Sequence, residues 1–250
     1  MIRVIPRLDI KWPNLIKGIQ LEGLRVIGNP SDFVRDYYQT GADEILLMDC
    51  VASLYNRNGI HDLVAKVAES IFVPICVGGG IRTSDDAKSL FRSGADKVAL
   101  NTAAFARPEL ISELADKFGA QAVVVSIEAK RISDDNWICY YDNGRENSGF
   151  EILVWVRKVE QLGAGELLIT SVDNEGTAIG YDTQLIELVS KNVNIPVIAS
   201  GGFGKPADAL AAIKAGANAV SIARSLHYKN LTIPEIKQSL HSSGVEVRLT

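Results

Sequence analysis

The chain has 250 residues, of which 47% are hydrophobic, so it suits one large α/β domain or two small ones with a sizeable core. A net charge of −4 argues against general binding to nucleic-acid phosphates, so basic side chains are expected to act locally. No apolar run approaches the roughly 20 residues of a membrane span, the start lacks a signal-peptide core, and three cysteines show no paired spacing. We therefore expect a soluble, cytoplasmic protein that binds neither membranes nor nucleic acids.

Short apolar runs rich in β-branched residues alternate along the chain with amphipathic stretches that carry helix start and stop signals. Strands that alternate with helices pair in parallel, and eight such units in a chain of this length match a (β/α)8 barrel, or TIM barrel. A doubly wound sheet is the alternative, although it rarely needs eight evenly spaced units. The eight runs begin at Arg3, Glu44, Val73, Lys97, Ala122, Glu166, Ile195 and Ala219.

The sequence contains an internal repeat, which sharpens this prediction. Residues 74–103 align without gaps on residues 196–225, and glycines, prolines and an aspartate recur at matching positions. A repeat of this length is not a solenoid, whose periods are about 20–50 residues. We expect the whole chain to form a single barrel domain built from two half-barrels, approximately residues 1–120 and 121–250.

The repeat places one carboxylate at the end of a strand in each half. Residues 7–11, "RLDIK", map with a small shift onto residues 126–130, "SIEAK". Asp9 and Glu128 should therefore end strands 1 and 5 and face each other across the C-terminal mouth, where barrel enzymes carry their catalytic residues. Such a pair could act as acid and base on a substrate between them. The alternative for each is a surface acid or an ion-pair partner of a nearby lysine.

Two glycine-rich segments predict a pair of phosphate sites. The segments "VGGGIRT" (77–83) and "ASGGFGK" (199–205) each close a strand and precede a helix. Backbone N–H groups at glycine and at helix N-termini bind anions. Each segment neighbours the end of the next strand, at residues 100–104 and 223–227. The doubled arrangement predicts a long substrate with a phosphate at each end, whereas the alternative is ordinary turn chemistry.

Four charged residues are predicted to meet at the opposite end of the barrel. Counting back from Asp9 in steps of two places Arg3 inward near the barrel floor. Glu44, Lys97 and Glu166 begin strands 2, 4 and 6, so charges of alternating sign could form a ring there. The residues alone favour a structural ion-pair plug. Because buried ion pairs are costly to desolvate, the ring also invites a second explanation.

One segment is too polar for the core. Residues 131–149 alternate in polarity and contain the turn sequence "DNG" at 142–144, which predicts a hairpin inserted after strand 5. The three histidines, His61, His227 and His241, lack metal-ligand spacing, so we expect no metal site.

Taken together, these segments resemble the cyclase subunit of imidazole glycerol phosphate synthase, a family of histidine biosynthesis. The resemblance runs nearly end to end and rests on "VGGGIR", "GADKVALNTAA", "VVVSIEAKR", "GAGELLITSVDNEGT", "GYD" and "IPVIASGG". It implies a lyase that needs no metal or organic cofactor. Such an enzyme uses ammonia to convert the bisphosphorylated phosphoribulosyl formimino aminoimidazole carboxamide ribonucleotide into imidazole glycerol phosphate and aminoimidazole carboxamide ribonucleotide.

The resemblance also implies a partner and a role for each matching residue. A glutaminase docks at the N-terminal face, and its ammonia passes through a gate formed by the charged ring. Asp9 and Glu128 stand at the two catalytic positions, and Lys17 lies on the loop after strand 1, where it helps to hold phosphate. The remaining matches are Gly80, Asn101 and Thr102 at one phosphate site, Gly176, Gly202 and Ser225 at the other, and Thr170 and Ser200 near the reacting centre.

Four residues depart from the family pattern. Glu128 and Glu175 stand where aspartate is usual, and Arg7 and Arg224 replace small residues. A guanidinium inside the barrel would pair with a carboxylate and lower its pKa. The departures keep open a paralogue that conducts ammonia for amidation or amidination of a surface-sugar precursor, with little cyclase activity. A third possibility is a binding or scaffold module without catalysis.

Overall fold

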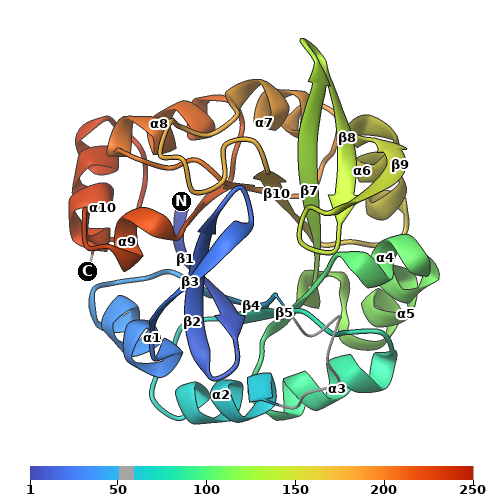
Figure 1. The fold of residues 1–250 in the computed structure, drawn as a ribbon, viewed down its shortest axis with the longest axis horizontal. Coiled ribbons are helices and arrows are strands. Elements are labelled where there is room, and N and C mark those ends of the chain that lie inside the picture. The colour runs from blue at the N-terminus through green and yellow to red at the C-terminus, as the bar shows by residue number, and fades with distance from the viewer. Residues whose placement is uncertain (51–58, 250) are drawn as a thin grey trace.

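The computed structural model describes residues 1–50 and 59–249, and these form a closed barrel of parallel strands surrounded by helices (Figure 1). The strands pair in sequence order, and β12 returns to β1, so the barrel has no free edge. The predicted eight-stranded TIM barrel is confirmed. Its strands are β1 (Arg3–Lys11), β4 (Ile45–Asp49), β5 (Ile75–Gly78), β6 (Lys97–Leu100), β7 (Val123–Ser133), β10 (Glu166–Ser171), β11 (Val197–Ser200) and β12 (Ala219–Ile222).

Helices surround the outside of the barrel (Figure 1). Several begin where the sequence supplies a cap: Thr83 and Asp86 form a capping box at α3, and Thr232 and Glu235 form one at α10. The helices are α1 (Pro30–Gln39), α2 (Gly59–Ala68), α3 (Ser84–Arg92), α4 (Thr102–Ala106), α5 (Glu109–Phe118), α6 (Ile152–Gln161), α7 (Thr183–Ser190), α8 (Pro206–Lys214), α9 (Arg224–His227) and α10 (Ile233–Ser242), with a 3₁₀ turn at Ala120–Ala122. None of the described helices is long and apolar enough to cross a membrane.

Two separate apolar clusters hold the fold together because successive side chains of a strand point to opposite faces. In β1, Val4 and Leu8 belong to the large cluster between strands and helices, whereas Ile5 belongs to a small cluster inside the barrel. The interior cluster forms one layer across the barrel. It contains Ile5, Leu46, Cys76, Ala99, Val124, Leu168, Ile198 and Ala219.

A hairpin that the sequence did not predict follows β1 and crosses the barrel mouth (Figure 1). It consists of β2 (Asn14–Ile19) and β3 (Glu22–Gly28), which are joined by a tight turn and pair in antiparallel fashion. β2 also pairs with the end of β1, where Asp9 lies opposite Ile16. The hairpin is therefore a continuation of a barrel strand, which places its side chains directly over the mouth.

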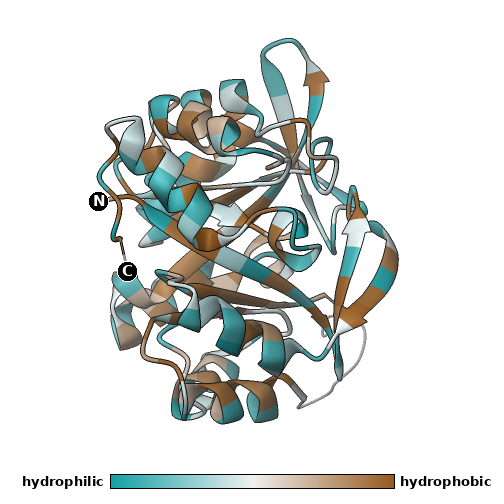
Figure 2. Ribbon diagram, turned by 90° about the vertical axis from the view of Figure 1, so that its left-hand side faces the viewer, coloured by the Kyte–Doolittle hydropathy of each residue, from teal (hydrophilic) through white to brown (hydrophobic). Residues whose placement is uncertain are grey.

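The polar segment after strand 5 forms a three-stranded antiparallel extension rather than a single hairpin. β7 continues beyond the barrel to Ser133 and pairs with β8 (Asn136–Tyr141), which pairs with β9 (Glu146–Glu151). Residues 142–144 all have positive φ and join β8 to β9, as the "DNG" pattern indicated. The far end of this extension projects beyond the barrel (Figure 2).

Candidate active site

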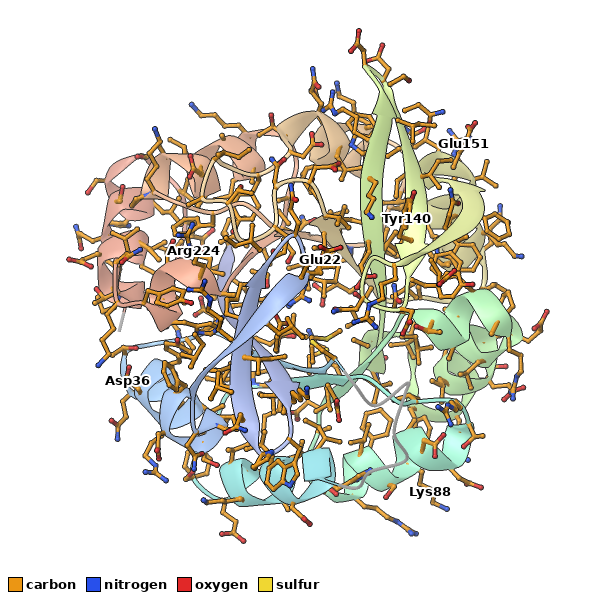
Figure 3. The ribbon with its side chains drawn as sticks, in the orientation of Figure 1. Glu22, Asp36, Lys88, Tyr140, Glu151 and Arg224 are labelled. Atoms are coloured by element: carbon orange, nitrogen blue, oxygen red, sulfur yellow. The ribbon has the colours of Figure 1, made fainter. Side chains whose placement is uncertain are left out.

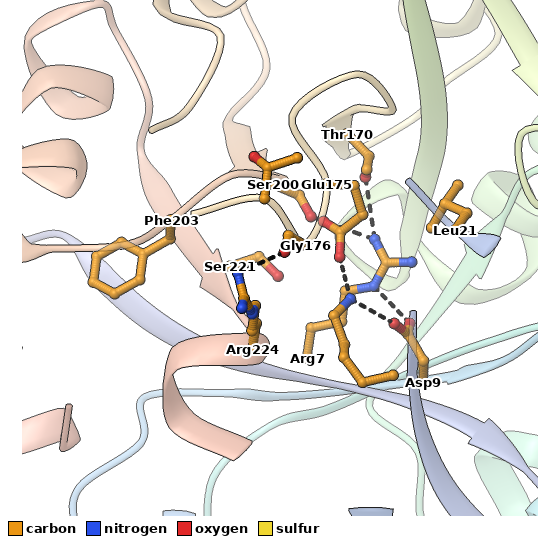
Figure 4. Close-up of polar contacts among 12 residues, drawn as sticks. Arg7, Asp9, Leu21, Thr170, Glu175, Gly176, Ser200, Phe203, Ser221 and Arg224 are labelled. Carbon is orange, nitrogen blue, oxygen red and sulfur yellow. Dashed lines mark hydrogen bonds and ion pairs between the residues drawn. The ribbon is translucent and has the colours of Figure 1, made fainter. Parts of the chain in front are cut away.

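Asp9 lies at the mouth end of β1 and is held between two cations (Figure 4). Arg7 Nε donates to its Oδ1 at 2.8 Å, and Lys17 Nζ donates to its Oδ2 at 3.3 Å. All three side chains are buried. Burial by itself would raise the pKa of Asp9, but the charges of Arg7 and Lys17 outweigh it and hold the pKa well below the usual range of a carboxyl. Asp9 is therefore an ionised carboxylate in this site.

Arg7 connects strand β1 with strands β10 and β11 across the barrel interior. Its Nη1 donates to Thr170 Oγ1 of β10 at 3.2 Å and to Ser200 Oγ of β11 at 3.3 Å. Burial would lower the pKa of Arg7, but the carboxylates of Asp9 and Glu175 raise it above its usual value. The guanidinium is thus a permanent charge at the centre of the mouth, in contact with both polar residues predicted near the reacting centre.

Lys17 lies in strand β2, whereas the sequence placed it on a loop. Besides Asp9, its ammonium forms an ion pair with Glu175, which follows β10. Burial would lower the pKa of Lys17, and the two carboxylates raise it above its usual value. The ion pairs of Lys17 with Asp9 and Glu175 therefore hold the β2–β3 hairpin over the mouth.

Glu128 lies on the far side of the mouth from Asp9, because β7 is separated from β1 by three strands in either direction around the barrel. Its Oε2 accepts a hydrogen bond from the backbone N–H of Gly144 at 2.7 Å. Burial raises the pKa of Glu128 to about 7, although Arg7 and the Gly144 N–H act in the opposite direction. Glu128 therefore exchanges a proton near neutral pH, as an acid–base group should.

A cavity of about 350 Å³ lies beside Glu128 and contains the first predicted phosphate site. Gly80, Asn101 and Thr102 all line it. Asn101 Nδ2 donates to the carbonyl of Ser126 at 2.9 Å, which fixes the amide at the end of β6. Gly80 has a φ of 72°, a conformation that favours glycine and turns the backbone at the cavity wall.

Sequence reasoning missed two cations of this cavity, Arg82 and Arg107. Both are exposed and line it together with the glycine segment. Arg82 is part of the quoted "VGGGIRT" segment, so its place directly after the glycines was the available signal. Arg107 follows α4 and carries no such signal.

The second predicted phosphate site is a cavity of about 10 Å³, which is the space of about one water molecule. Gly176, Gly202 and Ser200 line it, and Arg7 and Arg224 add two guanidinium groups. Arg224 Nη1 donates to the carbonyl of Gly176 at 2.9 Å (Figure 4). Figure 3 shows Arg224 on the inner side of the helical ring beside the hairpin.

Ser225, the remaining residue predicted for this site, does not line the cavity. It is buried, and its hydroxyl donates to the carbonyl of Phe203 at 3.1 Å. Its side chain therefore holds the glycine segment in place.

The four charged residues of the floor come together as predicted. Arg3 forms ion pairs with Glu44, at 2.5 Å, and with Glu166. Lys97 completes the ring through Glu44 at 2.9 Å and Glu166 at 3.0 Å. The interior apolar layer separates this ring from the mouth. Within residues 1–50 and 59–249, no cluster of three or more His, Cys, Asp or Glu residues is arranged to hold a metal ion.

Comparisons with known proteins agree with this geometry. Residues 3–232 match the family model described as "Histidine biosynthesis protein". The chain belongs to this family. It is 57% identical over 204 residues to "Imidazole glycerol phosphate synthase subunit HisF" of Legionella pneumophila, an alignment that covers 82% of this chain and 96% of the relative.

Two further relatives bear the same name and extend the match to nearly the full chain. The protein of Hydrogenobaculum sp. (strain Y04AAS1) is 46% identical over 248 residues, and that of Streptomyces griseus subsp. griseus is 44% identical over 247 residues. Each alignment covers 99% of this chain and 98% of the relative. By their names, all three relatives are subunits of a larger enzyme.

Within the histidine biosynthesis family, three of the four departures of this chain, Arg7, Glu175 and Arg224, line the second cavity. The fourth, Glu128, lines the first cavity, as Arg7 also does. Glu175 pairs with Lys17, and Arg224 donates to the carbonyl of Gly176. The departures therefore lie at both predicted phosphate sites.

Proposed function

We propose that this member of the histidine biosynthesis family is the cyclase subunit of imidazole glycerol phosphate synthase. The reaction combines ammonia with phosphoribulosyl formimino aminoimidazole carboxamide ribonucleotide and yields imidazole glycerol phosphate and aminoimidazole carboxamide ribonucleotide. The observation that carries the proposal is the pair of glycine-lined cavities that share Arg7 as a wall, with one buried carboxylate on each side of the mouth. A substrate with a phosphate at each end spans such a site.

Each cavity takes one phosphate of the substrate. Gly80, Asn101 and Thr102 bind the first, with Arg82 and Arg107 at the rim to attract the anion. The second phosphate binds at Gly176 and Gly202, beside Arg224, and Ser225 supports this site by holding the glycine segment in place through Phe203. Because this cavity has space for about one water molecule, the side chains that line it, Arg7 and Arg224 among them, have to rearrange before the second phosphate enters.

The catalytic groups lie between the phosphate sites. Asp9 and Glu128 transfer protons, Thr170 and Ser200 contact the reacting centre, and Lys17 changes partners from carboxylates to phosphate as the substrate binds. The contacts that support these roles are those of Arg7 to Asp9, Thr170 and Ser200, which join the four side chains in one hydrogen-bonded group.

Ammonia enters from the other end of the barrel. A glutaminase subunit docks at the N-terminal face, and the ring of Arg3, Glu44, Lys97 and Glu166 controls the entry of ammonia. The position of the ring, at the ends of the strands farthest from the mouth, supports this role. We further propose that the whole chain is one domain of two half-barrels and acts in the cytoplasm.

Turnover of the bisphosphorylated substrate with ammonium at alkaline pH tests the proposal. The wild-type protein should form both products, and Asp9→Asn and Glu128→Gln should each lower the rate by roughly 10²–10⁴-fold, as for the loss of an acid–base group. Lys191→Met is a matched control because its ion pair with Glu187 is exposed on α7. Absence of product at high enzyme concentration would contradict the proposal.

Complementation distinguishes the cyclase from an ammonia-conducting paralogue. The Arg7–Asp9 ion pair is the observation that favours the paralogue, because it engages a carboxylate that the cyclase reaction needs as an acid–base group. The gene should restore growth without histidine to a strain that lacks its own cyclase. A protein that docks the glutaminase but fails in this assay would instead serve a separate amidotransferase.

A further inference from the structure

The two carboxylates of the mouth have different surroundings, although they stand at repeat-related positions. Asp9 receives two charged donors, Arg7 Nε at 2.8 Å and Lys17 Nζ at 3.3 Å. Glu128 receives one neutral donor, the N–H of Gly144 at 2.7 Å, and forms no ion pair with the part of the chain that the structure describes. Among the described residues, the cations that pair with Asp9 therefore have no counterpart at Glu128.

We propose that Arg7 is a positioning residue that keeps Asp9 ionised in the resting enzyme, so that Asp9 accepts the proton and Glu128 donates the proton in turnover. This division of roles rests on the cyclase reaction proposed above. It follows from the general rule that two carboxyl groups take opposite acid–base roles when their environments separate their protonation equilibria. Arg7 has this effect because it pairs with Asp9 and not with Glu128.

The orientation of Arg7 is fixed by three hydrogen bonds in a buried site. Its Nε points to Asp9, and its Nη1 is shared between the hydroxyls of Thr170 and Ser200. The residue is 3% exposed, so solvent does not screen its charge. Arg7 also lines both cavities, which places its guanidinium beneath the middle of a substrate that spans them.

Charged groups from several elements face the two carboxylates, and their balance favours the same assignment. Around Asp9, two cations outweigh the other ionisable groups, which are the largely neutral His227 and Cys50. Around Glu128, the acids Asp9 and Asp142 oppose Arg7. The full set consists of Arg7 of β1, Lys17 of β2, Cys50 after β4, Asp142 after β8, Glu175 after β10 and His227 of α9.

Each turnover expels two groups, an oxygen atom as water and the nitrogen atom of aminoimidazole carboxamide ribonucleotide. Asp9 takes protons from the incoming nitrogen as its N–H bonds break, and Glu128 gives protons to the leaving oxygen and nitrogen as their bonds to carbon break. Between these steps each group returns to its resting state by exchange with water, so the two carboxyl groups gain and lose equal numbers of protons.

Carbon-13 NMR of the side-chain carboxyls measures the resting states directly, without substrate. The wild-type protein is labelled in its Asp and Glu carboxyls, and the two resonances are assigned by their loss in Asp9→Asn and Glu128→Gln. We expect the Glu128 signal to titrate near neutrality and the Asp9 signal to remain that of a carboxylate down to acidic pH. A protonated Asp9 near neutral pH, or equal midpoints for the two groups, would overturn the proposal.

Arg7→Cys tests whether Arg7 causes the asymmetry, and Arg7→Lys, which retains a cation, is its matched control. Loss of the guanidinium should raise the midpoint of Asp9 by about 1–3 pH units, the usual effect of a neighbouring arginine. Arg7→Lys should restore most of the difference. An unchanged Asp9 midpoint in Arg7→Cys would show that Lys17 alone sets the ionisation and would refute the role of Arg7.

The pH dependence of turnover completes the test and separates it from the proposed function. At a constant concentration of free ammonia, the wild-type rate should fall above about pH 7 as Glu128 loses its proton. The acidic limb, where Asp9 gains a proton, should move to higher pH in Arg7→Cys, because Arg7 pairs with Asp9. An acidic limb that stays in place would contradict the proposal. If no turnover occurs at all, the cyclase function fails, whereas the NMR result still decides the role of Arg7.

Discussion

At the scale of single residues, the most unusual group is Lys17, a lysine that is 3% exposed. Burial of an ammonium is tolerable because Asp9 and Glu175 both pair with it. Glu175 has no other ion-pair partner within residues 1–50 and 59–249. Removal of Lys17 would leave the buried carboxylate of Glu175 without its closest cation, so Lys17 should contribute to folding as well as to binding.

We predict that Lys17→Met destabilises the protein by about 3–5 kcal/mol at neutral pH, the usual cost of a buried charge without its partner. Urea unfolding of the variant and the wild type at neutral pH measures the difference. Lys191→Met, which breaks an exposed pair, should change the free energy of unfolding by less than about 1 kcal/mol. Equal losses in the two variants would contradict this prediction.

His227 and Glu128 have opposite effects on acid stability. His227 is buried, contacts the Tyr37 hydroxyl at 2.6 Å, and has its pKa lowered to about 4, chiefly by burial and then by Lys17. Because the unfolded chain binds this proton first, the folded state loses stability as the pH falls from about 6.5 to about 4. Glu128, whose pKa is raised to about 7, makes the folded state more stable as the pH falls through the same region.

Single variants should separate these two effects. Glu128→Gln should lose stability more steeply than the wild type on acidification, because the His227 effect is no longer offset. His227→Gln should lose less than the wild type, and each difference should amount to about 3 kcal/mol across the window. Urea unfolding at several pH values between about 4 and about 8 measures both slopes. Parallel curves for all three proteins would show that neither group has a shifted pKa.

At the scale of elements, the β2–β3 hairpin is held closed by contacts with two other loops. The backbone N–H of Gln20 donates to the carbonyl of Glu175 at 2.8 Å, and Asn143 Nδ2 donates to the carbonyl of Leu21 at 3.3 Å. The backbone of Gly176 lies directly against Gly18 of the hairpin. The closed position therefore depends on a close approach of two backbones.

We predict that Gly176→Ala opens the hairpin. A methyl group at Gly176 would lie 2.6 Å from the carbonyl oxygen of Gly18, which the backbone cannot accommodate without moving apart. The Michaelis constant for the bisphosphorylated substrate should rise by more than tenfold, and the hairpin should become more sensitive to proteases. Gly23→Ala is the matched control, since Gly23 also has a positive φ of 61° but has open space around it. Similar effects of both variants would indicate backbone strain rather than a lost contact.

At the scale of the whole molecule, the barrel separates two charged centres by an apolar layer. The mouth contains Asp9 and Glu128, whereas the floor contains the ring, and Ile5 and Leu168 belong to the layer between them. Changes at the floor should therefore leave the acid–base groups undisturbed. Any effect of the floor on turnover has to pass through the supply of ammonia.

We predict that Lys97→Met lowers glutamine-dependent turnover in the complex with the glutaminase and leaves ammonium-dependent turnover within about twofold of the wild type. Removal of Lys97 leaves Arg3 as the one cation of the ring that pairs with both Glu44 and Glu166, which rearranges the ring. The ratio of glutamine hydrolysed to product formed should increase above that of the wild type. Equal losses with both nitrogen sources would show that the variant damages the barrel rather than its gate.

The strands of the barrel were predictable because each is a short, buried run of β-branched residues. The hairpin was not, since β3 is exposed along most of its length and lacks the alternation of a half-buried strand. The floor ring was predictable from the alternation of side chains along β1 and from charges at strand starts. The Lys17–Glu175 ion pair was not, because it joins residues 158 positions apart and exists only when the hairpin is closed.

The closed barrel also bears on how the protein behaves in concentrated solution. Every barrel strand is paired on both sides within the barrel, so the free strand edges of the described chain belong to β3, to β9 and to the end of β7 beyond Ala129, at the two extensions around the mouth. Exposed strand edges invite pairing between molecules, and charged side chains and irregular pairing oppose it. β9 carries Glu146 and Glu151 and shifts register against β8, while β3 carries Glu22 and Arg25. These charges and irregular pairings oppose aggregation through the free strand edges. The edges lie at the end of the molecule that must stay accessible to substrate.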